Sequence, residues 1–154
     1  MRIRFTKMHG LGNDFVVVDA VTQAVDLTPE QARFLADRHF GIGCDQILVV
    51  EAAEDPDVDF RYRIFNADGG EVEQCGNGAR CVAELLRRRG LASGGALRMD
   101  SPAGIVEARV LAPGRISVDM GVPDFAPGAL PFVAPAAAAS YTLEAAGETL
   151  EIGA

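Results

Sequence analysis

The residues best suited to catalysis lie between positions 65 and 81, where one cysteine stands between two glycine-rich patches. Turn-forming residues fill positions 66–70, and the sequence Gly-Asn-Gly at 76–78 follows Cys75 directly. From position 79 onward the apolar residues recur at helical spacing. Cys75 is therefore predicted to stand at the start of a helix.

A helix start is a suitable place for acid–base chemistry on a carboxylate substrate. Its first backbone N–H groups have no partner within the helix, and the helix dipole is positive there. Such surroundings stabilise a thiolate and can also hold an anion. The glycines at 76 and 78 would let a ligand approach the backbone closely. We therefore expect a cysteine base or nucleophile beside a carboxylate-binding backbone.

The helix that begins here is expected to cover residues 77–89. Its apolar stripe, the three consecutive arginines near its end and the following Gly90 agree with a dipole-stabilised C-terminus and a C′ glycine. Cys81 lies on the same helix, roughly 9 Å further along the axis than Cys75 and about 120° around it. It cannot face Cys75 across a single carbon atom, so we interpret Cys81 as a core residue.

The remaining elements predict a mixed α+β fold. Apolar alternation or continuous apolar runs predict strands at 2–8, 15–18, 46–50, 58–65, 96–101, 104–111 and 116–120. Thr28, Pro29 and Gln31 are typical of an N-cap, a first helical position and a capping box, and predict a helix that runs to residue 39 or 40. Residues 123–139 are rich in proline and alanine and are expected to be irregular, and residues 141–152 are expected to add one or two edge strands.

Composition and charge argue against several classes of partner. The formal net charge of −8 is unfavourable for a surface that binds nucleic acid or an anionic membrane. No apolar run is long enough to span a bilayer, and the N-terminus alternates polar and apolar residues unlike a signal peptide, so a cytoplasmic location is expected. Three cysteines, an odd number, favour free thiols. Cys44 has no partner ligand at a suitable spacing, so no metal is expected.

Four blocks of the sequence resemble diaminopimelate epimerases and occur in the order of that family. The longest joins Phe-Asn-Ala-Asp-Gly at 65–69 to Gln-Cys-Gly-Asn-Gly-Ala-Arg-Cys at 74–81, and it is similar to the catalytic-cysteine motif of the family. The others are Lys-Met-His-Gly-Leu-Gly-Asn-Asp-Phe at 7–15, Gly-Ile-Gly-Cys-Asp-Gln at 41–46, and Ser-Pro-Ala-Gly at 101–104 with Val-Asp-Met-Gly at 118–121. The resemblance implies one lobe of a two-lobed fold, in which a mixed, mostly antiparallel sheet wraps around a central helix.

The resemblance also implies an activity and a set of site residues. The family interconverts LL- and meso-diaminopimelate, for lysine and peptidoglycan precursor synthesis, without a cofactor. One cysteine thiolate removes the α-proton, a second cysteine thiol protonates the opposite face, and Cys75 matches one of the two. The positions that match substrate-binding residues are Asn13, Gln46, Asn66, Gly76 and Asn77. The expected partner is thus a small molecule, diaminopimelate, and homodimers occur among relatives.

The second catalytic cysteine has no counterpart here, because Cys44 and Cys81 match family positions without an acid–base role. In the family this thiol comes from a second half of similar fold. We therefore expect an N-terminal half, in which residues 1–122 form the lobe with the catalytic cysteine and residues 123–154 form a connection with edge strands. Alone, such a chain is expected to be incomplete as a catalyst.

Three alternatives remain open from the sequence. The chain could be related to proline racemase-like isomerases of the same architecture, or be an inactive half-domain that binds an amino-acid carboxylate at 76–77. A thiol hydrolase would need His9 or His39 within hydrogen-bond distance of Cys75. Apart from the resemblance, Asn13 is more typical of a turn residue with positive φ, whereas the matching block favours a substrate contact.

Overall fold

A computed structural model describes residues 2–92 and 95–153. The chain divides into two compact units, Met1–Met120 and Gly121–Ala154. Within the described ranges, none of the helices combines the length and the apolar character needed to cross a membrane.

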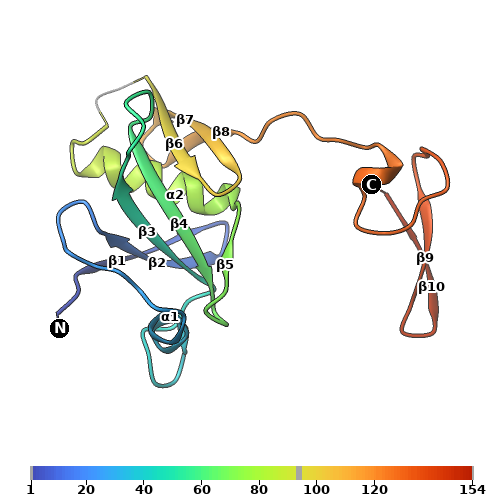
Figure 1. Cartoon of the computed structure of the whole chain (residues 1–154), viewed down its shortest axis with the longest axis horizontal. Coiled ribbons are helices and arrows are strands. Elements are labelled where there is room, and N and C mark those ends of the chain that lie inside the picture. The colour runs from blue at the N-terminus through green and yellow to red at the C-terminus, as the bar shows by residue number, and fades with distance from the viewer. Residues whose placement is uncertain (1, 93–94, 154) are drawn as a thin grey trace. The chain divides into compact units, whose positions relative to one another are not determined.

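In the described part of the first unit, eight strands form one sheet in the order β1-β2-β3-β4-β6-β7-β8, with β5 paired to β4. They are β1 (Phe5–Gly10), β2 (Asn13–Asp19), β3 (Gln46–Ala52), β4 (Phe60–Asn66), β5 (Glu71–Val72), β6 (Ala96–Ser101), β7 (Gly104–Ala112) and β8 (Arg115–Asp119). The pairs β2–β3 and β4–β6 are parallel and the others antiparallel. The sheet curves around helix α2 (Gly76–Arg88), which contacts β1, β2, β3, β7 and β8 (Figure 1). The predicted mixed, mostly antiparallel sheet around a central helix is confirmed.

Strands β2 and β3 contribute residues to the core on both faces of the sheet, because both faces are covered there. Every residue of 15–18 and of 47–50 is buried. Alternate side chains pack against α2 on one face and against helix α1 (Pro29–Ala36) on the other. A strand covered on both faces needs apolar residues at every position, which explains why these segments are continuous apolar runs.

Helix α1 begins where it was predicted to begin and ends earlier. The N-cap Thr28 and its capping box are present. The helix ends at Ala36, so the predicted end at residue 39 or 40 is wrong. The side chain of Asp37 accepts hydrogen bonds of 2.7 Å from the N–H groups of the second and third residues after it, and this turn competes with another helical turn.

Other helix and strand boundaries also differ from the predicted ones. Strand β1 begins at Phe5, since the N–H of Arg4 donates to the side chain of Gln23 at 2.8 Å instead of to a strand. The strand predicted at 58–65 begins at Phe60. Helix α2 starts one residue before the predicted range of 77–89 and ends one residue before its end.

Glu84 pairs with two arginines of the same helix, α2, and is expected to make stability depend on pH. Its buried carboxylate binds Arg87 at 2.9 Å and Arg88 at 2.8 Å, and the hydrogen bond from Arg87 is the main cause that lowers its pKa to about 2. Because the folded pKa lies below the ordinary value of 4.5, this contribution is complete above about pH 4.5 and is lost as the pH falls toward about 2.

We expect Glu84→Gln to lower the free energy of unfolding by about 1–2 kcal/mol at neutral pH, because it removes charge-assisted hydrogen bonds. Urea unfolding of both proteins between neutral pH and pH ~3 should show the difference shrinking as the pH falls. A difference that stays constant over this range would contradict the assignment.

The second unit contains a hairpin and an irregular segment. Strands β9 (Tyr141–Ala145) and β10 (Glu148–Ile152) pair antiparallel in a two-stranded sheet of their own. Before them, a short 3-10 helix, η1 (Pro127–Ala129), interrupts the proline- and alanine-rich segment. Residues 141–152 thus contain two strands where the sequence predicts one or two edge strands, and the two pair with each other in a separate sheet.

Candidate active site

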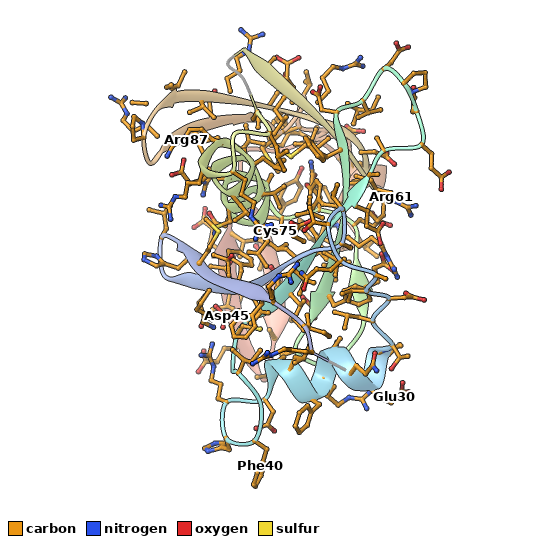
Figure 2. The ribbon with its side chains drawn as sticks, turned by 90° about the vertical axis from the view of Figure 1, so that its left-hand side faces the viewer. Glu30, Phe40, Asp45, Arg61, Cys75 and Arg87 are labelled. Atoms are coloured by element: carbon orange, nitrogen blue, oxygen red, sulfur yellow. The ribbon has the colours of Figure 1, made fainter. Side chains whose placement is uncertain are left out.

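Cys75 is the N-cap residue of α2, and it therefore stands at a helix start, as the sequence predicts (Figure 2). Its backbone is extended, with φ −150°, and its Sγ accepts a hydrogen bond of 3.4 Å from the N–H of Gly78. Only a glycine fits well at 78, since an added Cβ would lie 3.0 Å from Leu48 Cδ2. The helix start is thus packed against β3, and the thiol lies at its positive end.

Three strand ends meet beside this helix start. The parallel strands β2 and β3 begin at Asn13 and Gln46, and the antiparallel β4 ends at Asn66. Gln46 and Asn66 are directly opposite in the register, and Gln46 Nε2 donates to Asn66 Oδ1 at 2.8 Å. The amide residues predicted as substrate contacts therefore lie at one end of the sheet.

Asn13 joins this sheet end to the helix. Its Oδ1 lies 3.8 Å from Cys75 Sγ and accepts a hydrogen bond of 3.4 Å from Asn77 Nδ2. An added Cβ at Gly10 would lie 3.4 Å from Asn77 Cβ, so the β1–β2 hairpin packs closely on the first turn of α2. The positive φ values of this hairpin belong to Leu11 and Gly12, and Asn13 begins β2, so the alternative of Asn13 as a positive-φ turn residue is wrong.

Two buried polar atoms of the unit lack a hydrogen-bond partner among the described residues, Gln46 Oε1 and the Tyr62 hydroxyl. An unpaired buried acceptor is costly, so Gln46 Oε1 is suited to receive a donor from a ligand. Burial raises the pKa of Tyr62 to about 12, and a charge on Cys75 acts in the same direction, so the phenol is neutral at physiological pH. From the sequence, Tyr62 was predicted only to be one of the alternating apolar positions of the strand at 58–65.

The site also contains a residue that sequence reasoning missed. Asp45 follows the buried Cys44, and its Oδ2 accepts a hydrogen bond of 3.0 Å from Asn13 Nδ2. Asp45 belongs to the block at 41–46 that resembles the family, but nothing in its local pattern indicates this long-range contact.

The two histidines do not support the hydrolase alternative. Within the described part of the chain, Cys75 Sγ donates to Asn13 Oδ1 and accepts from the N–H of Gly78, and neither partner is a histidine. His39 follows α1 and is exposed, and His9 lies on β1 opposite Asp14. Among the same residues, no group of three or more His, Cys, Asp or Glu side chains could hold a metal ion.

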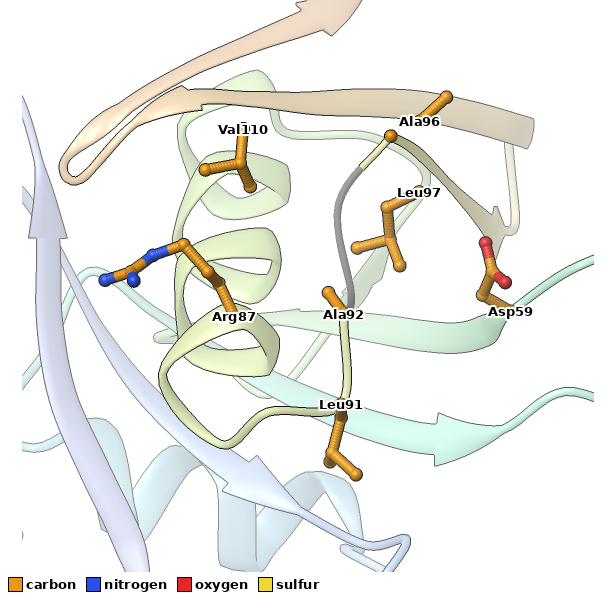
Figure 3. A pocket seen from close by; sticks show the side chains of 8 residues that line it. Asp59, Arg87, Leu91, Ala92, Ala96, Leu97 and Val110 are labelled. Atoms are coloured by element: carbon orange, nitrogen blue, oxygen red, sulfur yellow. The ribbon is translucent and has the colours of Figure 1, made fainter.

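A cavity of about 250 Å³ lies at the other end of α2, lined in part by Asp59, Arg87 and Leu91 (Figure 3). A helix C-terminus presents carbonyl groups and the negative end of the dipole. This cavity therefore lacks the thiol of the Cys75 end, and the end of the helix dipole beside it is negative instead of positive.

Cys75 is expected to be the thiol that iodoacetamide modifies in the folded chain. Cys44 and Cys81 are 2% and 4% exposed, and burial raises the pKa of both thiols, that of Cys81 to about 11. Peptide mapping after brief alkylation at neutral pH should find at least about tenfold more label on Cys75 than on the others, and label on all three in urea. Equal labelling in the folded protein would contradict this prediction.

Known proteins resemble this chain in both sequence and fold. The sequence model of one family, described as diaminopimelate epimerase, matches residues 5–126. Curated proteins of that name are 60% identical over 152 residues in Aromatoleum aromaticum and 59% identical over 155 residues in Thioalkalivibrio sulfidiphilus. A solved hydroxyproline epimerase from Agrobacterium vitis has a TM-score of 0.55 over 69% of this chain and 36% of its own, at 16% identity, which supports the fold.

The two curated relatives match nearly the whole of this chain, 99% and 100%, but only 55% and 56% of their own length. The chain therefore spans about half the length of the curated relatives it matches. The match includes the Cys75 helix start, the Asn13 hairpin and the Gln46–Asn66 pair. On these matches, the chain belongs to the diaminopimelate epimerase family.

Proposed function

We propose that this chain is the part of an amino-acid epimerase that supplies one catalytic thiol, Cys75, for the interconversion of LL- and meso-diaminopimelate. The observation that carries the proposal is the position of Cys75 Sγ, at the N-cap of α2 and 3.8 Å from Asn13 Oδ1. The family of the chain agrees with this assignment.

The geometry supports a role for the helix start in binding the α-carboxylate. Gly76 and Asn77 lie in the first turn of α2, where backbone N–H groups have no intrahelical acceptor. Removal of the α-proton places negative charge on the α-carbon and its carboxylate, and fixed N–H dipoles stabilise such charge. Gln46 Oε1 and the side-chain NH₂ group of Asn66, whose Oδ1 is bound by Gln46, offer further polar contacts for the ammonium and carboxylate groups of the substrate.

The proposed reaction consists of two proton transfers. The Cys75 thiolate takes the α-proton from one face, or its thiol returns a proton to that face in the reverse direction. A second thiol acts on the opposite face, and we assign it to the half of the relatives' length that this chain does not span. Side chains perform both transfers, so the proposal requires neither a cofactor nor a metal.

The proposal has three finer parts. They are a lobe formed by residues 1–122 with a connection at 123–154, a cytoplasmic enzyme and a homodimer. Light scattering of a full-length protein would measure the oligomeric state, and a monomer at micromolar concentration would overturn the dimer.

The test uses this chain alone and a chimera in which it replaces the matching 152 residues of the Aromatoleum aromaticum relative. Both are incubated with LL-diaminopimelate in deuterium oxide, and α-deuterium and meso product are followed. We expect exchange and epimerisation in the chimera and no meso product from the chain alone. A folded but inactive chimera, beside an active relative, would overturn the proposal.

A second candidate is a half-domain that binds the amino-acid carboxylate without turnover. The position of the site at a helix start and the half-length match favour it for the chain by itself. Calorimetric titration of the chain with diaminopimelate would detect such binding, and binding without exchange would support this reading for the isolated chain.

A further inference from the structure

A cluster of charged residues lies beside the site, and none of its members transfers a proton in the proposed reaction. It contains two carboxylates, Asp14 and Asp45, and two cations, Lys7 and Arg38. Arg38 Nη2 binds Asp14 Oδ1 at 2.7 Å and Asp45 Oδ1 at 2.8 Å, and Lys7 Nζ binds Asp14 Oδ2 at 2.7 Å. In addition, the backbone N–H of Asp14 donates to Asp45 Oδ2 and the backbone N–H of Asp45 donates to Asp14 Oδ1, both at 2.9 Å.

Stability alone does not explain the Arg38–Asp45 pair of this cluster. The side chains of Arg38 and Asp45 are 55% and 45% exposed, and exposed ion pairs contribute little to folding. What the cluster does is fix the position of the Asp45 carboxylate, which is held from one side by Arg38 and from the other by the N–H of Asp14. This carboxylate is the one that binds Asn13.

The contact with Asp45 determines which way the Asn13 amide faces. The N–H of Asp14, followed by the Asn13 amide, lowers the pKa of Asp45, so its carboxylate is ionised at neutral pH and can only accept hydrogen bonds. The group of Asn13 that faces it must therefore be the NH₂ group. The carbonyl oxygen then faces Cys75 Sγ and Asn77 Nδ2, whereas the reversed amide would place two NH₂ groups against each other.

We propose that Asp45 is a positioning residue that acts through Asn13, by fixing its amide so that Oδ1 accepts the hydrogen bond of the Cys75 thiol. This inference deepens the proposed function, because it assigns the group that orients the catalytic thiol. Without Asp45 the amide can rotate and present its NH₂ group to sulfur, which favours the thiolate instead of the thiol.

The test measures the rate of Cys75 alkylation by neutral iodoacetamide in this chain as a function of pH, and it needs no turnover. Asp45→Ala removes the acceptor, whereas Asp45→Asn keeps a carbonyl acceptor in the same place and removes only the charge. We expect Asp45→Ala to raise the rate at neutral pH by about fivefold and Asp45→Asn to change it by less than about twofold. In an Asn13→Ala background, Asp45→Ala should have no further effect.

An unchanged rate in folded Asp45→Ala would overturn the proposal, and so would two other results. Equal effects of the alanine and asparagine variants would assign the change to charge, and an effect that persists without Asn13 would show that Asp45 does not act through it. Alkylation of Cys44 and Cys81 would reveal an unfolded variant. In that case Asp45→Ser would replace Asp45→Ala, both alone and in the Asn13→Ala background.

In the active chimera Asp45→Ala should also lower kcat/KM about tenfold. An inactive chimera would leave the alkylation cycle unaffected, so the two proposals fail separately.

Discussion

Replacing Cys75 with serine in the chimera is expected to abolish epimerisation while leaving the fold as stable as before, or more stable. Serine is among the preferred N-cap residues, so its hydroxyl should accept the Gly78 N–H at least as well as Sγ does at 3.4 Å. A serine hydroxyl is far less acidic than a thiol and is not ionised at neutral pH. We expect kcat/KM to fall by at least about 10³-fold, and the free energy of unfolding to change by less than about 1 kcal/mol.

The serine variant separates chemistry from folding more sharply than alanine, which would remove the cap as well. Deuterium exchange at the α-carbon and urea unfolding are the two measurements. Cys81→Ala is the matched control, because it removes a thiol from the same helix at a buried position. The control should keep its turnover and lose some stability. Near-normal exchange by Cys75→Ser would overturn the assignment of the base.

Local patterns in the sequence predicted the elements that carry the site. The capping box at Thr28 and the glycine-rich approach to Cys75 depend on residues within a few positions of each other, and both are present. The end of α1 was wrong because Asp37 bonds to the backbone of the residues after it, and propensity alone does not decide between this turn and another turn of helix.

The contacts between the predicted site residues could not be derived from local patterns. Gln46 and Asn66 meet because β3 and β4 are antiparallel with one particular register, and Asn13 reaches the same end because β2 runs parallel to β3. Both facts depend on pairing between distant segments. The family resemblance supplied these residues, but it did not indicate that Asp45 orients Asn13.

The fold depends on close backbone contacts that glycine permits, and Gly69 is the most informative example. This residue lies in the turn between β4 and β5, with φ 84°, and an added Cβ would lie 2.3 Å from the carbonyl oxygen of Pro29 in the first turn of α1. The turn also binds α1 through Arg33 Nε, which donates to the carbonyl oxygen of Asp68 at 3.0 Å. Gly69 therefore allows the turn after Asn66 to pack on α1.

Gly69→Ala is expected to lower the free energy of unfolding by about 3 kcal/mol or more, the sum of backbone strain and a clash with backbone atoms that cannot move aside. Gly114→Ala isolates the strain, because Gly114 has φ 73° and no atom within 4 Å of an added Cβ, and it should cost about 1 kcal/mol. Gly41→Ala isolates the clash, since φ is not positive there and the added Cβ would lie 1.9 Å from the carbonyl oxygen of Phe34. In urea unfolding, the alanine variants at Gly69 and Gly41 should lose much more free energy of unfolding than the variant at Gly114, because a clash with backbone atoms costs more than positive-φ strain alone. Equal losses at Gly69 and Gly114 would show that the turn can move away from α1, and that the end of β4 is not fixed by this contact.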